Sequence, residues 1–303
     1  MLLFQYDFKL EFYAAGADIK NQKPKFIIET QNGAPVVNIV IDNERSLVSL
    51  LQCKKARLQL FNMPLNFNKS LRHGDIVRIF YKKFAYEGDS SYKFVMAGYL
   101  GAPIDFDFEN GDFIVQYEVY LLSQDTFLNK KLDVKNYIGK SLEDAINLAF
   151  PGQAVIYMSM QDRERVINES FYAPTLREFI DRFIRKYVHL IFVDFGELDF
   201  RVDTKFIFIN FGSLFKRKGY KRLEDFALLF IPQREVRFVG KSAVNFWNTT
   251  LLFTDNIKVG DGVEFRDRYG EIVKAFVQET SAVLNNVGDC TLRLRLYDES
   301  NVL

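Results

Sequence analysis

The stretch LLFQYDFKLEF (residues 2–12) alternates apolar and polar side chains and is typical of the whole chain. Period two places every second side chain on one face of an extended chain, so this stretch predicts a β-strand with one buried face. Aromatic side chains at this spacing fit a pleated sheet better than a helix bundle. The side chains on the shared face are Phe4, Tyr6, Phe8, Leu10 and Phe12.

Short strand-like runs separated by turn residues continue to about residue 125. They are KFIIET (25–30), VVNIVI (36–41), ARLQLF (56–61), IVRIFYKKF (76–84), YKFVMAGYL (92–100), IDFDF (104–108) and FIVQYEVYLL (113–122). Regular turns between many short strands predict a sandwich or a barrel. The Asn32-Gly33 turn predicts a hairpin between the first two runs. Because an open sheet exposes its edges, we expect closure or assembly with neighbouring chains.

The pattern changes near residue 126. SLEDAINLAF (141–150) places apolar residues at helical spacing behind an N-cap serine, Ser141. PTLREFIDRFIRKY (174–187) predicts a longer helix, with Thr175 and Glu178 as a capping box. Strands are expected at AVIYMSM (154–160), HLIFVDF (189–195) and KFIFINF (205–211). Residues 126–210 therefore read as an α+β unit with two helices on a small sheet.

Strands return after residue 210 and end in CTLRLRLYD (290–298), where leucine and arginine alternate. The strings HGDIVRIF (73–80) and VGDGVEFR (259–266) both place Gly-Asp before a strand that carries a valine. Gly-Asp often forms a turn that leads into a strand, so the two similar strings are compatible with two similar β units. We expect three units: a β unit at residues 1–125, the α+β unit at 126–210 and a second β unit at 211–303.

The charge balance excludes a general argument for nucleic-acid or membrane binding, because 40 basic and 39 acidic side chains leave a net charge of +1. The N-terminal MLLFQYDFKL lacks a basic region and predicts no signal peptide. The longest uncharged stretch, residues 145–161, is broken by proline and glycine and predicts no membrane span. Cys53 and Cys290 have no CxxC partner, so we expect two buried thiols, and a bridge between them stays open.

The sequence contains no recognisable catalytic string. His73 and His189 lack a GxSxG, HExxH or P-loop context, so we expect a turn histidine and a strand histidine. Asp105, Asp107 and Glu109 alternate on one strand, which is more typical of a solvated sheet edge than of a glycosidase carboxylate pair. The prediction is no catalytic residue, no cofactor and no metal site.

The densest positive charge is the run KRKGYKR at residues 216–222. Its cations and its tyrosine could contact phosphate and stack on a base, or dock a partner, although a solvated hairpin is the more common reason for such a run. The candidate contact residues are Lys216, Arg217, Lys218, Tyr220, Lys221 and Arg222.

Two series of strings carry a resemblance to a known family. The first is ARLQLFNM (56–63), Gly74-Asp75-Ile76-Val77, Phe94 and Gly98-Tyr99-Leu100; the second is LLFIPQ (228–233), LLFTDNIKVGDGV (251–263) and EIVKAFVQE (271–279). In this order they resemble the late-control and tail-hub proteins of phage baseplates. The chain also resembles a spirochaete prophage protein family of undefined activity. It departs from the hub pattern at Tyr81-Lys82-Lys83-Phe84, where the family has Ala-Gly-Tyr.

The resemblance implies a mainly β fold in which two β-barrel-like domains flank a small α+β domain. It further implies a homotrimeric ring whose barrels mimic the hexameric tail tube, with tube and spike proteins as partners and with non-specific DNA contact in the lumen. Such a protein is made in the host cytoplasm, ends up in the virion tail and is not an enzyme.

Two other functions stay open from the sequence. A β-sandwich module could bind a carbohydrate or a surface protein through exposed tyrosines or Trp247, and a hydrolase could use the acidic strand near Asp105.

Overall fold

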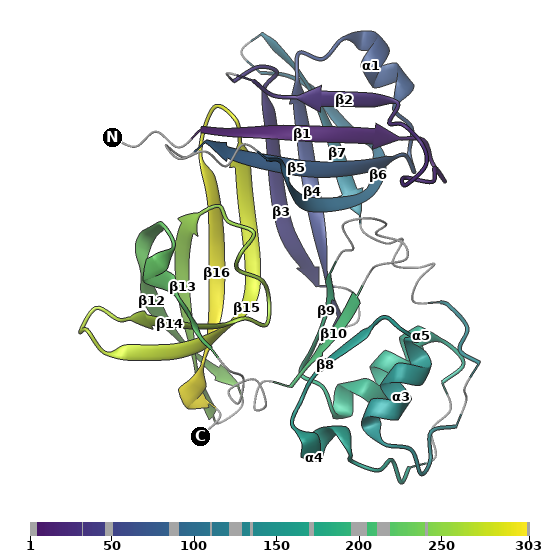
Figure 1. The fold of residues 1–303 in the computed structure, drawn as a ribbon, viewed down its shortest axis with the longest axis vertical. Helices are drawn as coiled ribbons and strands as arrows, with labels where there is room; N and C mark the ends of the chain where they lie inside the picture. The colour runs from purple at the N-terminus through teal and green to yellow at the C-terminus, as the bar shows by residue number, and fades with distance from the viewer. Residues whose placement is uncertain are drawn as a thin grey trace.

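The computed structural model describes residues 5–31, 33–45, 51–84, 91–109, 111–120, 129–133, 136–169, 173–194, 205–210, 219–239 and 242–301. The fold is mainly β, with most helices gathered in the middle third of the chain (Figure 1). No helix within these ranges is long and apolar enough to cross a membrane.

The first part of the chain forms an antiparallel sheet with the order β2-β1-β5-β6-β7-β4-β3. The predicted apolar face of β1 is buried, since Phe8, Leu10 and Phe12 are fully buried, but Asp7 and Glu11 on the opposite face are buried as well, so burial does not alternate along this strand. The elements are β1 (Gln5–Tyr13), β2 (Phe26–Glu29), β3 (Val37–Arg45), β4 (Leu51–Phe61), α1 (Leu65–Ser70), β5 (Ile76–Phe84), β6 (Lys93–Glu109) and β7 (Asp112–Tyr120).

The expected hairpin between β2 and β3 is wrong. β2 pairs with β1, and β3 pairs with β4 and β15, while among the described residues of the turn an isolated bridge joins Gln31 and Ala34. The buried positions Ile39 and Ile41 of β3 join the same apolar core as Ala282 and Leu284 of β15. Burial against a strand far away in the sequence therefore outweighed the local turn signal.

The middle unit is α+β. Its helices pack on one face of a sheet with the order β8-β10-β9, and the other face contacts the C-terminal unit through Ile209, Val259 and Phe276. The predicted strand at 154–160 ends at Tyr157, because Ser159 caps α4. The elements are α3 (Leu142–Ala149), β8 (Ala154–Tyr157), α4 (Met160–Arg163), α5 (Leu176–Glu178), β9 (Leu190–Asp194) and β10 (Lys205–Ile209).

The C-terminal part has the order β12-β13-β16-β15-β14, with β11 beside β14. The same order appears as β3-β4-β7-β6-β5 in the N-terminal part, with β1 beside β5. The two β parts thus share one arrangement of five strands. The elements are β11 (Lys221–Arg222), β12 (Leu228–Val239), β13 (Ser242–Leu252), β14 (Gly262–Arg266), β15 (Ile272–Asn285) and β16 (Cys290–Asp298).

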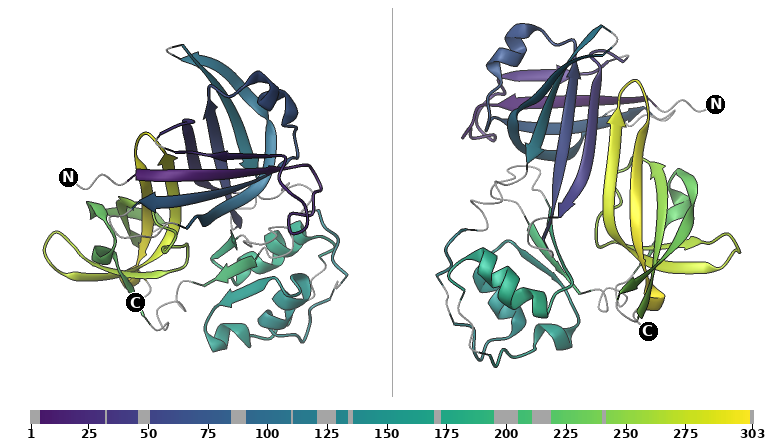
Figure 2. Two further views of the ribbon diagram at one scale, coloured as in Figure 1. Left: turned by 45° about the horizontal axis from the view of Figure 1, so that its top comes forward. Right: turned by 180° about the vertical axis from the view of Figure 1, so that it is seen from behind.

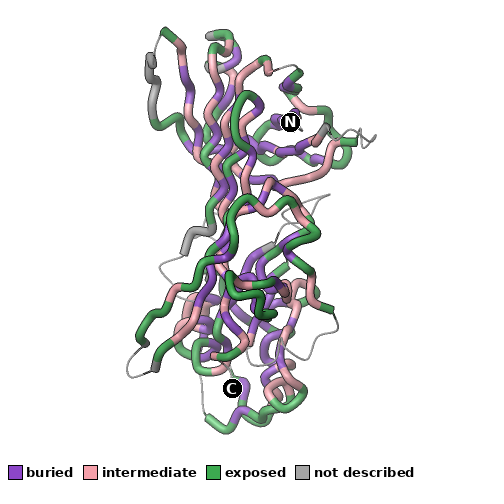
Figure 3. Tube along the Cα trace, turned by 90° about the vertical axis from the view of Figure 1, so that its left-hand side faces the viewer, coloured by how far each residue is buried: buried purple, intermediate pink, exposed green. Residues whose placement is uncertain are grey.

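The two β parts are joined into one continuous sheet by four pairs between β15 and β3, from Ala282↔Ile41 to Asn285↔Asn38. Figure 2 shows the yellow strands of the C-terminal part beside the purple and blue strands of the N-terminal part from two further sides. Along these strands buried and exposed residues alternate (Figure 3), and the buried ones from both parts form one apolar core. The main hydrogen-bonded path through the described strands is open and runs from β12 to β2.

Candidate functional site

The loop before β5 is organised by the buried carboxylate of Asp75. This carboxylate accepts hydrogen bonds from the backbone N–H groups of Ala15 at 3.0 Å and Arg72 at 2.9 Å, and it forms an ion pair with Lys25 at 2.9 Å. Gly74 has a φ of +86°, which an L-residue adopts only with strain. The loop is fixed to β6, because Gly74 N–H donates to Leu100 O and Leu100 N–H donates to Asp75 O.

The loop before β14 repeats this arrangement. Gly260 has a φ of +89°, its N–H donates to Val277 O, and Val277 N–H donates to Asp261 O. The Asp261 carboxylate accepts from Lys258 N–H at 2.8 Å and forms an ion pair with Lys221 at 2.7 Å. The Gly-Asp echo in the sequence therefore marks two loops with the same hydrogen-bonding pattern, one in each β part.

Three described residues of the basic run, Tyr220, Lys221 and Arg222, contact other side chains of the same chain. Lys221 is held by Asp261, Arg222 lies 3.8 Å from Glu264, and the Tyr220 ring carries the ammonium of Lys274 at 4.8 Å from its centroid. Partial burial, with Glu299 and Glu264 nearby, raises the pKa of Tyr220. Tyr220 also packs against Gly262. Lys216, Arg217 and Lys218 lie outside the described residues, so their predicted contact with phosphate or a partner stays a prediction.

The surface that sequence reasoning missed is the outer edge of β12. Within the described chain this strand pairs with β13 alone, and it exposes Leu229, Phe230 and Ile231, the latter two by 63% and 61%. Soluble proteins usually protect such an edge with charge, proline or a covering element, and Pro232 supplies only part of that protection. The available signal was the run FALLFIP (226–232), which lacks the alternation of a half-buried strand.

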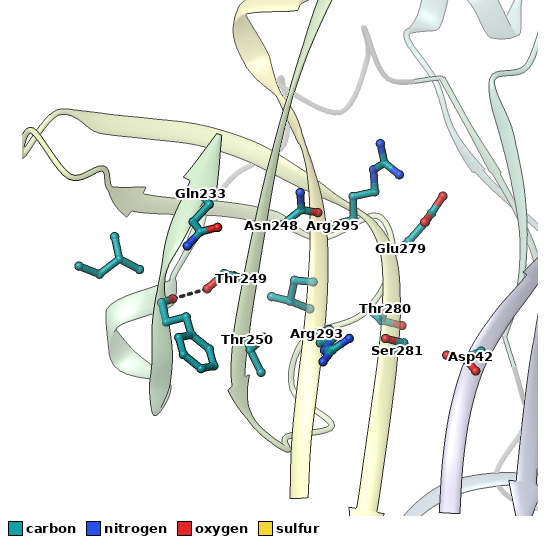
Figure 4. Close-up of a pocket in the computed structure, with 13 residues that line it drawn as sticks. Asp42, Gln233, Asn248, Thr249, Thr250, Glu279, Thr280, Ser281, Arg293 and Arg295 are labelled. Carbon is teal, nitrogen blue, oxygen red and sulfur yellow. Dashed lines mark hydrogen bonds between the residues drawn. The ribbon is translucent and has the colours of Figure 1, made fainter. Parts of the chain in front are cut away.

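A polar face extends from this edge across the sheet. A shallow hollow of about 610 Å³ lies over β12, β13, β16, β15 and β3 and is lined by Asn248, Thr250, Ser281, Arg293 and Asp42, among others (Figure 4). Thr249, which also lines the hollow, donates to Phe230 O at 2.6 Å.

The polar face continues through β3, β4 and β7. Asn38 donates to the side chain of Gln59, Gln59 donates to that of Gln116, and Lys55 pairs with Glu118 at 2.9 Å. Cations, anions and amides mix on this face, so it is hydrophilic without one dominant sign of charge.

The other candidates from the sequence do not form a reactive centre in the described residues. His73 is exposed in the Gly74 turn, and His189 lies at the start of β9, where desolvation lowers its pKa against the opposing effect of Asp162. The side chains of Asp105, Asp107 and Glu109 lie outside the described set. No group of three metal-ligating side chains occurs in the part of the chain that the structure describes.

Cys53 and Cys290 are both buried thiols, as expected. Burial raises the pKa of the Cys290 thiol to about 12, which makes this thiol unreactive at neutral pH. Trp247 is only 7% exposed, and its indole N–H donates to Asp298 at 2.6 Å. A ring held in this way is not a platform for a sugar.

A family model described as "Protein of unknown function (DUF693)" matches residues 1–301. The chain belongs to the DUF693 family. No curated protein matches it. This DUF693 protein has two β parts with one strand order, and its α+β unit lies between them in the chain.

Solved structures with this fold include phage tail proteins. A tail protein from Neisseria meningitidis MC58 is 10% identical, with a TM-score of 0.58, and the match covers 98% of this chain and 97% of that one. The 43 kDa tail protein of prophage MuSo2 from Shewanella oneidensis is 8% identical, with a TM-score of 0.56 over 97% and 98% of the chains. A chain of the Francisella PdpA-VgrG complex is 12% identical, with a TM-score of 0.51 over 99% and 53%. The expected resemblance to phage tail proteins is thus confirmed for the fold of this DUF693 protein.

Proposed function

We propose that this protein is a structural hub of a phage-like tail baseplate, in which three copies form a ring between the tail tube and the central spike. The observation that carries the proposal is the repeated strand order of the two β parts, because three such chains present six similar units around one axis. The tail-protein fold over nearly the full length of both chains supports the same role. The three units at residues 1–125, 126–210 and 211–303 belong to this proposal, with the two β parts acting as barrel-like domains.

The polar sheet face fits the wall of a conduit. Its mixture of charges and amides stays hydrated without holding a polyanion strongly, which suits the passage of DNA with only non-specific contact. The place of the protein is then the virion tail, after synthesis in the host cytoplasm, and the tube and spike proteins are its partners.

The test is the mass and shape of the assembled protein. Light scattering at increasing concentration is expected to give three times the chain mass of 35.4 kDa, and electron microscopy with the tube protein of the same tail operon is expected to show rings stacked on the tube end. A protein that stays monomeric at high concentration and also leaves the tube protein unchanged would contradict the proposal.

A further inference from the structure

The repeated strand order predicts a second strand pair equivalent to β15·β3, and a single chain does not form this pair among its described residues. The strand order places β3, β4, β7 and β6 of the N-terminal part at the positions of β12, β13, β16 and β15 of the C-terminal part. β15 pairs with β3 of the other part, whereas the equivalent stretch of β6, residues 103–109, has β7 as its only partner strand among the described residues. β12, the equivalent of β3, likewise pairs with β13 alone.

The registers define the correspondence residue by residue. Leu100 is equivalent to Val277, since both receive the N–H of the Gly-Asp glycine, and β6 and β15 both show a register shift directly after this residue. β6 pairs with β7 in the same way as β15 pairs with β16. When these two registers are followed from Leu100 and from Val277, residues 106–109 of β6 correspond to residues 282–285 of β15. On the other strand, Gln233 and Arg234 take the positions of Val40 and Ile41.

We infer that β6 of one copy pairs antiparallel with β12 of a second copy of this chain, with Asp107 opposite Gln233, so that the contact repeats the β15·β3 junction between molecules. This inference rests on the proposed function and names the strands that would close the ring. The sheet from β12 to β6 has its two free edges at opposite ends, so the contact is head-to-tail and repeats from copy to copy.

The exposed edge of β12 supports this occupant. In this register the end of β6 would lie along the stretch of β12 that exposes Phe230 and Ile231, and it would take these apolar side chains out of water. Pro232 donates no N–H, so the ladder is interrupted at that position and side-chain burial carries more of the contact.

Disulfide trapping tests the pairing. Protein with Asp107→Cys is mixed with protein carrying Gln233→Cys and then oxidised, and covalent dimers are expected from the mixture but from neither variant alone. The matched control is Val40→Cys with Val283→Cys in one chain, which spans the existing junction and should form a bridge within the chain. Wild-type protein controls for Cys53 and Cys290, which are both buried.

A second variant tests the same edge without cysteine. Ile231→Lys is expected to weaken self-association by about tenfold or more, because it places a charge in the covered strand. Val166→Lys, on a side chain 51% exposed in the α+β unit, is expected to leave association unchanged.

The outcomes separate the inference from the proposed function. Rings that form without the mixed disulfide, or disulfides of Asp107→Cys with itself, would overturn the pairing and leave the hub function standing. A monomer even with the tube protein would overturn both. If mixed disulfides link the copies into open-ended assemblies and no rings form, the result would support the pairing of β6 with β12 and contradict the closed ring of the proposed hub.

Discussion

Asp75 is the residue on which the N-terminal Gly-Asp loop depends. Its carboxylate is only 2% exposed and receives three hydrogen-bond donors from three separate segments, at Ala15, Lys25 and Arg72. Asp261 has the same position in the second loop, but its carboxylate is 24% exposed. Asp75 is more deeply buried than Asp261 and accepts from one more backbone N–H, so we expect it to contribute more to stability, because unpaired groups are costly only where water is excluded.

Asp75→Ala is expected to lower the free energy of unfolding by about 3 kcal/mol or more, since it leaves the Lys25 ammonium and two backbone N–H groups without their acceptor. The matched variant Asp261→Ala is expected to cost about 1–2 kcal/mol, because water reaches its partners. Urea denaturation of both variants measures the difference. Equal losses would show that the burial of the first loop contributes nothing.

At the scale of elements, the close pairing of β6 with β7 depends on a glycine. A Cβ at Gly98 would lie 2.6 Å from Tyr120 O and 2.8 Å from a methyl group of Val119, so no side chain fits without displacing the backbone of β7. At Gly101 the nearest atom is the far end of the Tyr120 ring at 3.1 Å, and this ring can turn aside. The glycine of the Gly98-Tyr99-Leu100 string is therefore required by the close packing of β6 against β7.

Gly98→Ala is expected to destabilise the fold by about 3 kcal/mol, within the range of overpacked cores, whereas Gly101→Ala is expected to cost less than about 1 kcal/mol. Thermal unfolding followed by circular dichroism compares the two variants. A Gly98→Ala protein that unfolds at the wild-type temperature would refute the close approach of β6 to β7.

In the helical element at 174–187, the spacing of apolar residues predicts the buried face but not the type of helix. Its apolar stripe is buried as predicted, with Leu176, Phe179, Ile180, Phe183 and Ile184 in the core of the middle unit. Thr175 accepts from Glu178 N–H at 3.3 Å, so the predicted cap is present. The backbone, however, follows α5 only to Glu178 and continues as a π turn (Phe179–Phe183) and a 3₁₀ turn (Ile184–Lys186).

At the scale of the whole molecule, Asn286 binds the two β parts to each other. Its carboxamide oxygen accepts from Val37 N–H at 2.8 Å, and its amide donates to Pro35 O at 2.9 Å, with the side chain buried beside the β15·β3 junction. Tyr6 adds a second link by donating to Phe253 O at 3.2 Å. These contacts join residues about 250 positions apart in the chain.

Asn286→Ala is expected to lower the free energy of unfolding by about 2 kcal/mol, because the buried N–H of Val37 loses its acceptor. It should also accelerate hydrogen exchange at the amides of β3 and β15. Asn285→Ala is the control, since the Asn285 side chain accepts from Val287 N–H within the local turn. Unchanged exchange in β3 after the Asn286 substitution would show that the junction does not need this residue.

The sequence by itself determined the character of the elements. Alternation of apolar residues placed β1 and β16, helical spacing placed α3, and the two Gly-Asp strings marked two equivalent loops, because each of these signals depends on neighbours in the chain. Only the tertiary structure decided which strands meet. The partner of β3 is β15 and not β2, and the free edges of β6 and β12 emerge only once the whole sheet is assembled. Strand pairing is set by the burial of side chains from distant segments, and no local pattern encodes that choice.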